Sequence, residues 1–270
     1  MQYALVDGIR TKPAKGLKGI CTGCKKDVTA KCGSVKIHHW AHNSLRDCDT
    51  WWEPETEWHL NWKNQFPEEY REVVFFAENG DLHRADIHTP KGVTIEFQNS
   101  PISFEELTSR VNFYDKLIWI INAQSFRNQI DAFPIPDPEH PLLAQYEICG
   151  YSRHSKSYNY PTNSNEAINF MNSLMLRRIA EYPQDPEEGR VRSFGEKLFI
   201  KARHKATKNP LLYETFDWRY KRKAWLNCSA PVFFDFGDDC LRWLKYRKNP
   251  QDQKPYFKLV SKANFIKHYI

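Results

Sequence analysis

The 270-residue sequence lacks any run of about 18 apolar residues, the length that a membrane-spanning helix requires. Its first residues lack the apolar segment of a secretion signal, and no internal repeat is visible. The first two absences predict a cytoplasmic protein without a membrane partner.

Aromatic residues make up 14 % of the sequence and include nine Trp, which need a packed core or a stacking surface. We therefore expect a folded chain rather than a disordered one. The number of Cys, seven, is odd, and Cys21, Cys24, Cys32 and Cys48 lie close together in the sequence. In a reducing compartment this clustering indicates metal binding rather than disulfides.

The net charge of +6 is unevenly distributed along the chain. From Arg177 to the C-terminus there are 21 Lys or Arg against 11 Asp or Glu, whereas the preceding residues carry a net charge of −4. A basic C-terminal third suits binding to a polyanion such as nucleic acid. A solvated, lysine-rich surface without such a partner is the alternative.

Composition and periodicity predict four regions. They are a Cys/His-rich module (1–50), a core with strong periodicity (51–130), a Pro-rich linker or extended segment (131–165), and a basic, aromatic-rich α+β region (166–270). In the last region, residues 218–225 interleave cations with aromatic side chains, which suits contacts to DNA phosphates and stacking on bases. The alternative is a helix that buries Trp218 and Trp225.

Periodicity and turn signals in the core predict a helix, three strands, a helix and a strand, in that order. The expected ranges are 55–66, 72–77, 82–89, 93–98, 103–116 and 117–121. This order is typical of an α/β layered fold in which one helix crosses over between strands. Farther along we expect helices at 165–182 and 195–206, strands at 230–238, 241–246 and 256–260, and a short terminal helix.

Asp86 and Glu96 lie in neighbouring predicted strands joined by a tight turn, so both carboxylates can lie on one face of the hairpin. Like charges placed together are unfavourable unless a cation neutralises them, and a hard divalent cation does so through oxygen ligands. Glu57 in the preceding helix is a candidate third carboxylate, and Gln98 shares the face of Glu96. Two solvent-facing acidic residues are the alternative.

A second acidic group lies at the end of the strand and turn predicted at 230–238. It consists of Asp235, Asp238 and Asp239. Asp is favoured in turns because its side chain accepts hydrogen bonds from nearby backbone N–H groups. The pattern therefore favours a turn over a second cation site.

Several motifs of the core resemble those of the competence protein CoiA-like family. The resemblance is carried by Thr56-Glu57-Trp58-His59, Trp62-Lys63, His83-Arg84-Ala85-Asp86-Ile87, the stretch from Gly92 to Ser103, Arg110 and Tyr114, and it extends to Cys21, Cys24 and His39-Trp40-Ala41-His42. That family belongs to the PD-(D/E)XK nuclease superfamily. The resemblance therefore implies a restriction-endonuclease-like αβββαβ core.

The same resemblance assigns roles to the acidic residues. Glu57, Asp86 and Glu96 match the catalytic carboxylates, of which Asp86 and Glu96 would hold Mg²⁺ or Mn²⁺. Gln98 takes the position in which the superfamily usually has Lys. Because a neutral amide cannot supply positive charge, more of the stabilisation of the transition state would come from the metal.

Two pairs of residues are candidates for contacts to the substrate. Arg110 and Tyr114 are four residues apart on one predicted helix face, and His59 and Lys63 have the same spacing on the first helix. For Arg110 and Tyr114 the alternative is packing against the sheet. For His59 and Lys63 it is a position on the surface.

The module at 1–50 contains a C-x-x-C motif followed by paired histidines, which is a zinc-ligand arrangement. We expect Cys21, Cys24, His39 and His42 to be the ligands. His38 would give a different spacing to His42, and Cys48 is an alternative to one histidine. A closed set of four ligands would make the zinc structural.

The sequence thus predicts a metal-dependent nuclease that hydrolyses phosphodiester bonds in DNA and carries a zinc-braced module. The alternative is a catalytically weak or inactive zinc-containing protein that binds DNA and recruits recombination or DNA-processing proteins. Uptake of DNA, defence against foreign DNA and mobile elements are all compatible settings.

Overall fold

The computed structural model describes residues 1–42, 48–49, 51, 54–77, 80, 82–135, 137–139, 212–248 and 253–270, together with the backbone of 146–148 and 176–178. The chain divides into two compact units. Unit 1 comprises Met1–Asn122, Asn227–Val232 and Ala263–Ile270, and unit 2 comprises Ala123–Leu226 and Phe233–Lys262. The expected module at 1–50 therefore falls in the same unit as most of the expected core.

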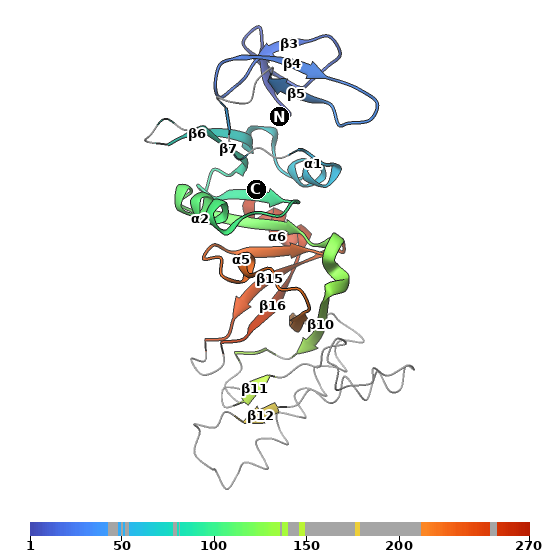
Figure 1. Ribbon diagram of the computed structural model, residues 1–270, viewed down its shortest axis with the longest axis vertical. Coiled ribbons are helices and arrows are strands. Elements are labelled where there is room, and N and C mark those ends of the chain that lie inside the picture. Colours follow the sequence, from blue (N-terminus) through green and yellow to red (C-terminus); the bar gives the residue numbers. More distant parts are fainter. Residues whose placement is uncertain are drawn as a thin grey trace. The chain divides into compact units, whose positions relative to one another are not determined.

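Unit 1 begins with a five-stranded antiparallel sheet, in the order β2-β1-β3-β4-β5, of which Figure 1 labels β3, β4 and β5. Its strands are β1 (Ala4–Val6), β2 (Ile9–Thr11), β3 (Lys18–Ile20), β4 (Asp27–Lys31) and β5 (His39–His42). The alternation of β4 buries Val28 and Ala30 and leaves Asp27 exposed. Trp40 of β5 is only 1 % exposed and fills the small core of this sheet.

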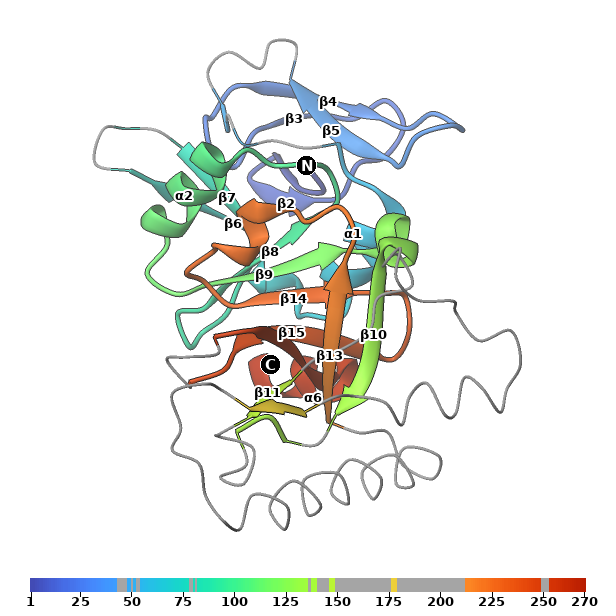
Figure 2. The same ribbon diagram turned by 60° about the horizontal axis from the view of Figure 1, so that its bottom comes forward.

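The second part of unit 1 confirms the predicted order of elements. It contains α1 (Glu57–Lys63), the 3₁₀ helix η1 (Glu68–Tyr70), β6 (Arg71–Phe76), β7 (Leu82–His88), β8 (Thr94–Gln98), α2 (Phe104–Phe113) and β9 (Leu117–Asn122). The four strands pair in the order β9-β8-β7-β6, and β8 lies parallel to β9 (Figure 2). Parallel neighbours need a crossover connection, which α2 provides.

Local signals explain where both helices of this part begin. The Thr56 side chain accepts a hydrogen bond from the backbone N–H of His59, so α1 starts after Thr56 rather than at residue 55. The Ser103 side chain likewise accepts from the backbone N–H of Glu106, so α2 starts after Ser103. All five residues of β8 are buried, as are Leu117 to Ile121 of β9, which explains their continuous apolar character.

Unit 2 contains an antiparallel group of strands in which β13 pairs with β10 and β16, and β15 pairs with β16 and β14. The bounds are β10 (Ile130–Ile135), β13 (Tyr213–Trp218), β14 (Val232–Asp235), β15 (Cys240–Tyr246) and β16 (Pro255–Ser261), with η2 (Gln124–Gln129) and α5 (Lys223–Leu226). A separate pair joins β11 (Tyr146–Ile148) to β12 (Leu176–Arg178). The terminal helix α6 (Lys262–Tyr269) packs Phe265 of unit 1 against Trp62.

The strands predicted at 230–238, 241–246 and 256–260 are confirmed as β14, β15 and β16, and the terminal helix as α6. The helix predicted at 165–182 is wrong at 176–178, where β12 is a strand. The rest of that range and the helix predicted at 195–206 lie outside the described residues. The strand β10 takes up residues 131–135 of the expected linker, because its backbone pairs with β13.

The aromatic side chains at 218 and 225 belong to the core and not to a stacking surface. Trp218 is 1 % and Trp225 2 % exposed, whereas Tyr220 is 60 % exposed. Trp218 ends a strand and Trp225 lies in a short helix, so the two indoles are buried from different elements. Among the described residues, no helix has both the length and the apolar character needed to cross a membrane.

Candidate metal centre and carboxylate cavity

Three carboxylates lie in one row across β6, β7 and β8. The pairs Arg71↔Ile87 and Val73↔Ala85 place Glu72 across from Asp86. The pairs Ile87↔Ile95 and His88↔Thr94, continued by one step, place Glu96 across from Asp86. Residues directly opposite in a sheet share a face, so the row brings Glu72, Asp86 and Glu96 together.

The backbone pairing of β7 with β8 extends from His88 only as far as Ile87 opposite Ile95. Beyond this point side chains replace the backbone bonds. Asp86 Oδ2 accepts from the N–H of Phe97 at 2.9 Å, and Glu96 Oε1 accepts from the N–H of Asp86 at 3.4 Å. The two strands thus separate at the carboxylates, which opens the sheet there.

These carboxylates line a cavity of about 70 Å³, enough space for several water molecules. The acidic residues around it are Asp49, Glu55, Glu72, Asp86 and Glu96. The basic residues around it are Lys63, Arg84 and Arg110. Carboxyl groups therefore outnumber the basic side chains of the cavity wall.

Lys63, in the last turn of α1, neutralises part of this charge. Its Nζ lies 2.8 Å from Asp86 Oδ1, 2.8 Å from Glu55 Oε1 and 3.5 Å from Glu72 Oε1. Burial lowers the pKa of Lys63, but the surrounding carboxylates, Asp86 first, raise it well above its usual value. The side chain, 8 % exposed, is therefore a buried ammonium ion.

Glu96 is held from the other side by Arg110 of α2. Arg110 Nη1 lies 3.3 Å from Glu96 Oε2, and Arg110 Nη2 donates to the carbonyl of Trp51 at 2.8 Å. Burial and the neighbouring Asp86 raise the pKa of Glu96 well above its usual value, although Arg110 opposes the shift. Arg110, expected at the substrate, instead fixes a carboxylate of the cavity.

Glu72 is the most strongly held carboxylate. Its two oxygens accept from the backbone N–H of Gln2 at 2.8 and 2.9 Å. Burial raises the pKa of Glu72, but Lys63 and other nearby positive charges outweigh burial and lower it to about 2. Its φ of +50° is a left-handed conformation that is strained for a residue other than Gly.

Two residues expected in the catalytic set lie elsewhere. Glu57 is exposed and does not line the cavity, because α1 begins at Glu57 and turns this side chain outward. Gln98 is buried, and its Nε2 donates to the carbonyl oxygen and to the side chain of Ser100 at 3.1 and 3.3 Å. Gln98 thus holds the loop that leads into α2.

Two residues expected at the substrate serve packing. His59 lines the cavity, but its ring nitrogens bond Thr56 Oγ1 at 2.9 Å and the carbonyl of Phe97 at 3.1 Å. Tyr114 is the residue after α2, and its ring packs against Phe75. Burial raises the pKa of Tyr114, so its hydroxyl stays neutral.

Glu55, Glu72, Asp49 and Arg84 of the cavity were not predicted. For Glu72 a signal existed, since the strand register places it across from Asp86. Arg84 also carried one, because residues two apart in a strand share a face and Arg84 precedes Asp86 by two. Glu55 and Asp49 lie outside helices and strands, so no periodicity indicates where their side chains point.

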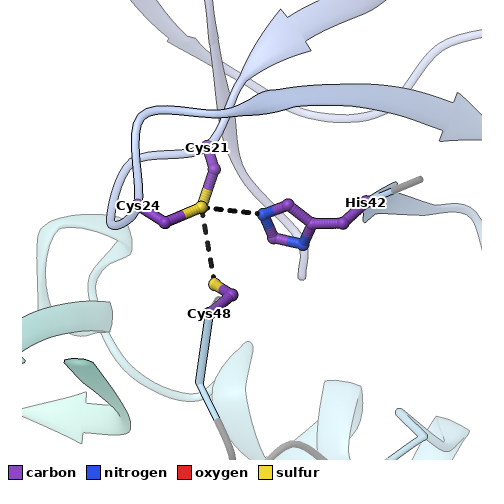
Figure 3. A group of neighbouring side chains, drawn as sticks. All are labelled: Cys21, Cys24, His42 and Cys48. Atoms are coloured by element: carbon purple, nitrogen blue, oxygen red, sulfur yellow. Dashed lines mark hydrogen bonds between the residues drawn. The ribbon is translucent and has the colours of Figure 1, made fainter. Parts of the chain in front are cut away.

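A second cluster lies in the Cys/His module, where Cys21, Cys24, His42 and Cys48 converge (Figure 3). Their ligand atoms all lie within 4.8 Å of one another, with 3.9 Å between the sulfurs of Cys21 and Cys48 and 3.2 Å between Cys24 Sγ and His42 Nε2. Tetrahedral zinc with Zn–S bonds of about 2.3 Å has S···S edges of about 3.8 Å. The group can therefore hold a metal ion such as zinc.

This group corrects the predicted ligand set in one position. Cys21, Cys24 and His42 are members as expected, but the fourth is Cys48 and not His39. His39 and His42 are three residues apart in β5, and a strand turns side chains at odd spacings to opposite faces. His39 Nδ1 instead bonds the carbonyl of Ile37 at 2.7 Å.

The sulfur of Cys21 also accepts a hydrogen bond from Arg84 Nη2, at 3.3 Å. The hydrogen bond between Cys21 and Cys48 and the positive charge of Arg84 lower the pKa of the Cys21 thiol, against the effect of burial. The thiolate is the form of cysteine that binds metals. The surroundings of Cys21 therefore favour metal binding.

The fold and this group define a mixed α+β protein with a Cys₃His group that could hold a metal ion. Residues 12–50, which contain the four residues of the group, match the family model of the competence protein CoiA N-terminal domain. The match confirms the resemblance to the CoiA-like family over this segment. No curated protein and no solved structure matches the chain.

Proposed function

We propose that the chain is a divalent-metal-dependent nuclease of the PD-(D/E)XK type that hydrolyses phosphodiester bonds in DNA. The observation that carries the proposal is that Asp86 and Glu96 face one cavity together with Lys63. The order α1-β6-β7-β8-α2-β9 supports it, since it is the order of the αβββαβ core. The match to a competence protein domain supports DNA as the substrate.

In this proposal Asp86 and Glu96 hold Mg²⁺ or Mn²⁺ through oxygen ligands, which hard cations prefer. When bound, the metal would activate a water molecule and neutralise charge on the phosphate. Arg110 keeps Glu96 in position on one side. On the other side Lys63 lies beside Asp86 and supplies the positive charge that Gln98 lacks.

The test is cleavage of single-stranded, duplex and branched DNA by the purified full chain with Mg²⁺ or Mn²⁺. We expect cleavage with either cation. We expect Asp86→Ala and Glu96→Ala to lower the rate at least about 100-fold, in the range found when one charge-stabilising group is lost. Glu57→Ala is the matched control, because Glu57 is exposed outside the cavity. Absence of cleavage by the wild type, or equal rates for Asp86→Ala and the wild type, would contradict the proposal.

One observation favours the second function, DNA binding without cleavage. Lys63 and Arg110 already pair with Asp86 and Glu96, which reduces the need for a metal. In that case binding to DNA weakens with salt and survives both Ala substitutions, and no product forms. The cleavage assay, run beside a binding assay at several salt concentrations, separates the two functions.

A further inference from the structure

The carboxylate cavity shares lining residues with a second cavity, which lies beside the Cys₃His group. A second cavity of about 120 Å³ lies against His42 and Cys48. Met1, Asp49 and Arg84 line both cavities. The two sites therefore meet at these three residues, of which Asp49 and Arg84 have charged side chains.

Asp49 directly follows Cys48 in the chain, and its side chain is tied to β7. Its Oδ2 accepts from the backbone N–H of Arg84 at 3.1 Å, and its Oδ1 lies 3.6 Å from His83 Nδ1. The side chain is 12 % exposed. The position of Cys48 in the group thus sets where Asp49 lies against the strand that carries Asp86.

Arg84 makes the second connection. Its guanidinium donates to Cys21 Sγ, and its strand position, two residues before Asp86, puts both side chains on one face of β7. The C-x-x-C turn also packs on the start of this strand, because a Cβ on Gly23 would lie 2.4 Å from Leu82 Cδ1. A shift of Cys21 or of the C-x-x-C turn would therefore displace side chains of β7 that are in direct contact with them.

A third connection reaches Glu96. Trp51 stacks on His83 with 3.3 Å between ring centroids, and its carbonyl accepts from Arg110. Arg110 in turn pairs with Glu96. The chain at 48, 49 and 51 thus contacts, in order, the metal-binding group, β7 and the arginine that holds Glu96.

We propose that Asp49 and Arg84 are positioning residues that couple occupancy of the Cys₃His group to the cation affinity of the carboxylate cavity. The inference rests on the proposed function, since it requires a cation at Asp86 and Glu96. Zinc ties Cys48 to Cys21, Cys24 and His42, and this fixes Asp49 and the guanidinium of Arg84. Without zinc these contacts loosen and the cavity loses its arrangement.

The test measures Mn²⁺ binding to the full chain by electron paramagnetic resonance, with and without zinc in the Cys₃His group. We expect removal of zinc to weaken Mn²⁺ binding about 10- to 100-fold, the range for loss of groups that orient metal ligands. Because coupling between two binding sites is reciprocal, Mn²⁺ is expected to raise zinc affinity by the same factor. Zinc content, measured by release to a colorimetric chelator, gives a second readout.

The Asp49→Asn/Arg84→Met double variant decides whether these two residues carry the coupling. It keeps all four ligands, so at saturating zinc we expect full zinc content even though Arg84 no longer assists Cys21, together with weak Mn²⁺ binding and no further response to zinc removal. Asp27→Asn, an exposed change in β4, is the control and is expected to respond to zinc as the wild type does. If the double variant does not fold, the single variant Arg84→Gln replaces it. For this variant we expect a partial loss of the effect of zinc on Mn²⁺ binding.

Two results would overturn the coupling and leave the proposed function standing. One is Mn²⁺ binding that depends on Asp86 but not on zinc. The other is an equal response to zinc in the wild type and in the double variant, which would indicate general destabilisation. Absence of Mn²⁺ binding in the zinc-loaded wild type would overturn both proposals.

Discussion

Two acidic clusters of this protein, each of which the sequence offered as a candidate cation site, differ in structure. At the turn after β14, Asp235 accepts from the backbone N–H of Gly237 and pairs with Lys262, both at 2.8 Å. Asp238 accepts from the backbone N–H of Cys240 at 3.2 Å and pairs with Arg242 at 2.9 Å. Each of these two aspartates thus has a backbone donor two residues away and a cation, as the turn prediction required.

The carboxylates of the cavity are not neutralised by residues close to them in the sequence. Glu72, Asp86 and Glu96 come from three strands, and their charge partners Lys63 and Arg110 come from two helices. More carboxylates than cations line the space between them. Carboxylates satisfied within their own turn therefore indicate structure, whereas carboxylates gathered from separate elements around a cavity indicate a site.

Removal of the buried cation Lys63 should have the largest effect. Lys63→Met leaves Glu55, Glu72 and Asp86 buried without their charge partner, and breaking a buried pair costs about 3–5 kcal/mol. We expect a fall of that size in the free energy of unfolding, measured by urea denaturation without added divalent cation. Lys12→Met is the control, because Lys12 and Glu68 form an exposed pair, 60 % and 50 % exposed, worth at most about 1 kcal/mol. Equal effects of the two changes would refute the buried-charge account of the cavity.

The pH dependence of stability tests the same cluster through Glu72. Its folded pKa of about 2 lies below the usual 4.5, so its contribution to stability is complete above pH 4.5 and is lost as the pH falls towards 2. A shift of this size corresponds to about 3 kcal/mol. We therefore expect Glu72→Gln to lower the free energy of unfolding by that order at pH 7 and by progressively less below pH 4.5. A difference that stays constant with pH would show that Glu72 gains nothing from its charge.

Glu55 and Glu57 offer a matched pair two residues apart. Glu55 holds Lys63 at 2.8 Å, whereas Glu57 is exposed. If the chain is a nuclease, Glu55→Gln is expected to slow cleavage about 10-fold, the lower end for residues that orient a functional group. Glu57→Gln is expected to cleave like the wild type. The opposite ranking would favour the assignment made from the sequence over the one made from the structure.

The smallest effect is expected at the turn. Asp238 is 36 % exposed and pairs with Arg242, and its hydrogen bond to Cys240 is local. Asp238→Asn is therefore expected to lower the free energy of unfolding by about 0.5–1 kcal/mol. Thermal or urea denaturation of the variant measures this directly. A loss as large as that of Lys63→Met would remove the distinction between the two clusters.

The sequence predicted those features that depend on local periodicity. The core elements from α1 to β9 follow apolar patterns and caps, and strand register sufficed to bring Asp86 and Glu96 together. The predicted H-x-x-H pair failed because residues 39–42 form a strand, whose alternation separates His39 from His42. Glu57 was chosen through the family resemblance, whereas Glu55, two residues earlier, was not considered as a site residue and lies just before α1.

Side chains whose positions depend on contacts with distant parts of the chain could not be predicted from local periodicity. Asp49 owes its place to Cys48 on one side and to β7 on the other, and neither contact leaves a periodic trace in the sequence. The role of Lys63 was underestimated for the same reason. Its burial depends on Glu55, Glu72 and Asp86 meeting at one point.

The end of the backbone pairing between β7 and β8 has a spectroscopic consequence. The backbone N–H of Asp86 donates to the side chain of Glu96, and that of Phe97 donates to the side chain of Asp86. Neither of these two bonds goes to a backbone carbonyl of the neighbouring strand. We expect a ligand that binds those carboxylate oxygens to change the length or direction of these two bonds. The amide resonances and solvent-exchange rates of Asp86 and Phe97 are therefore built-in reporters of the cavity, readable by NMR of the isotopically labelled chain without an attached probe.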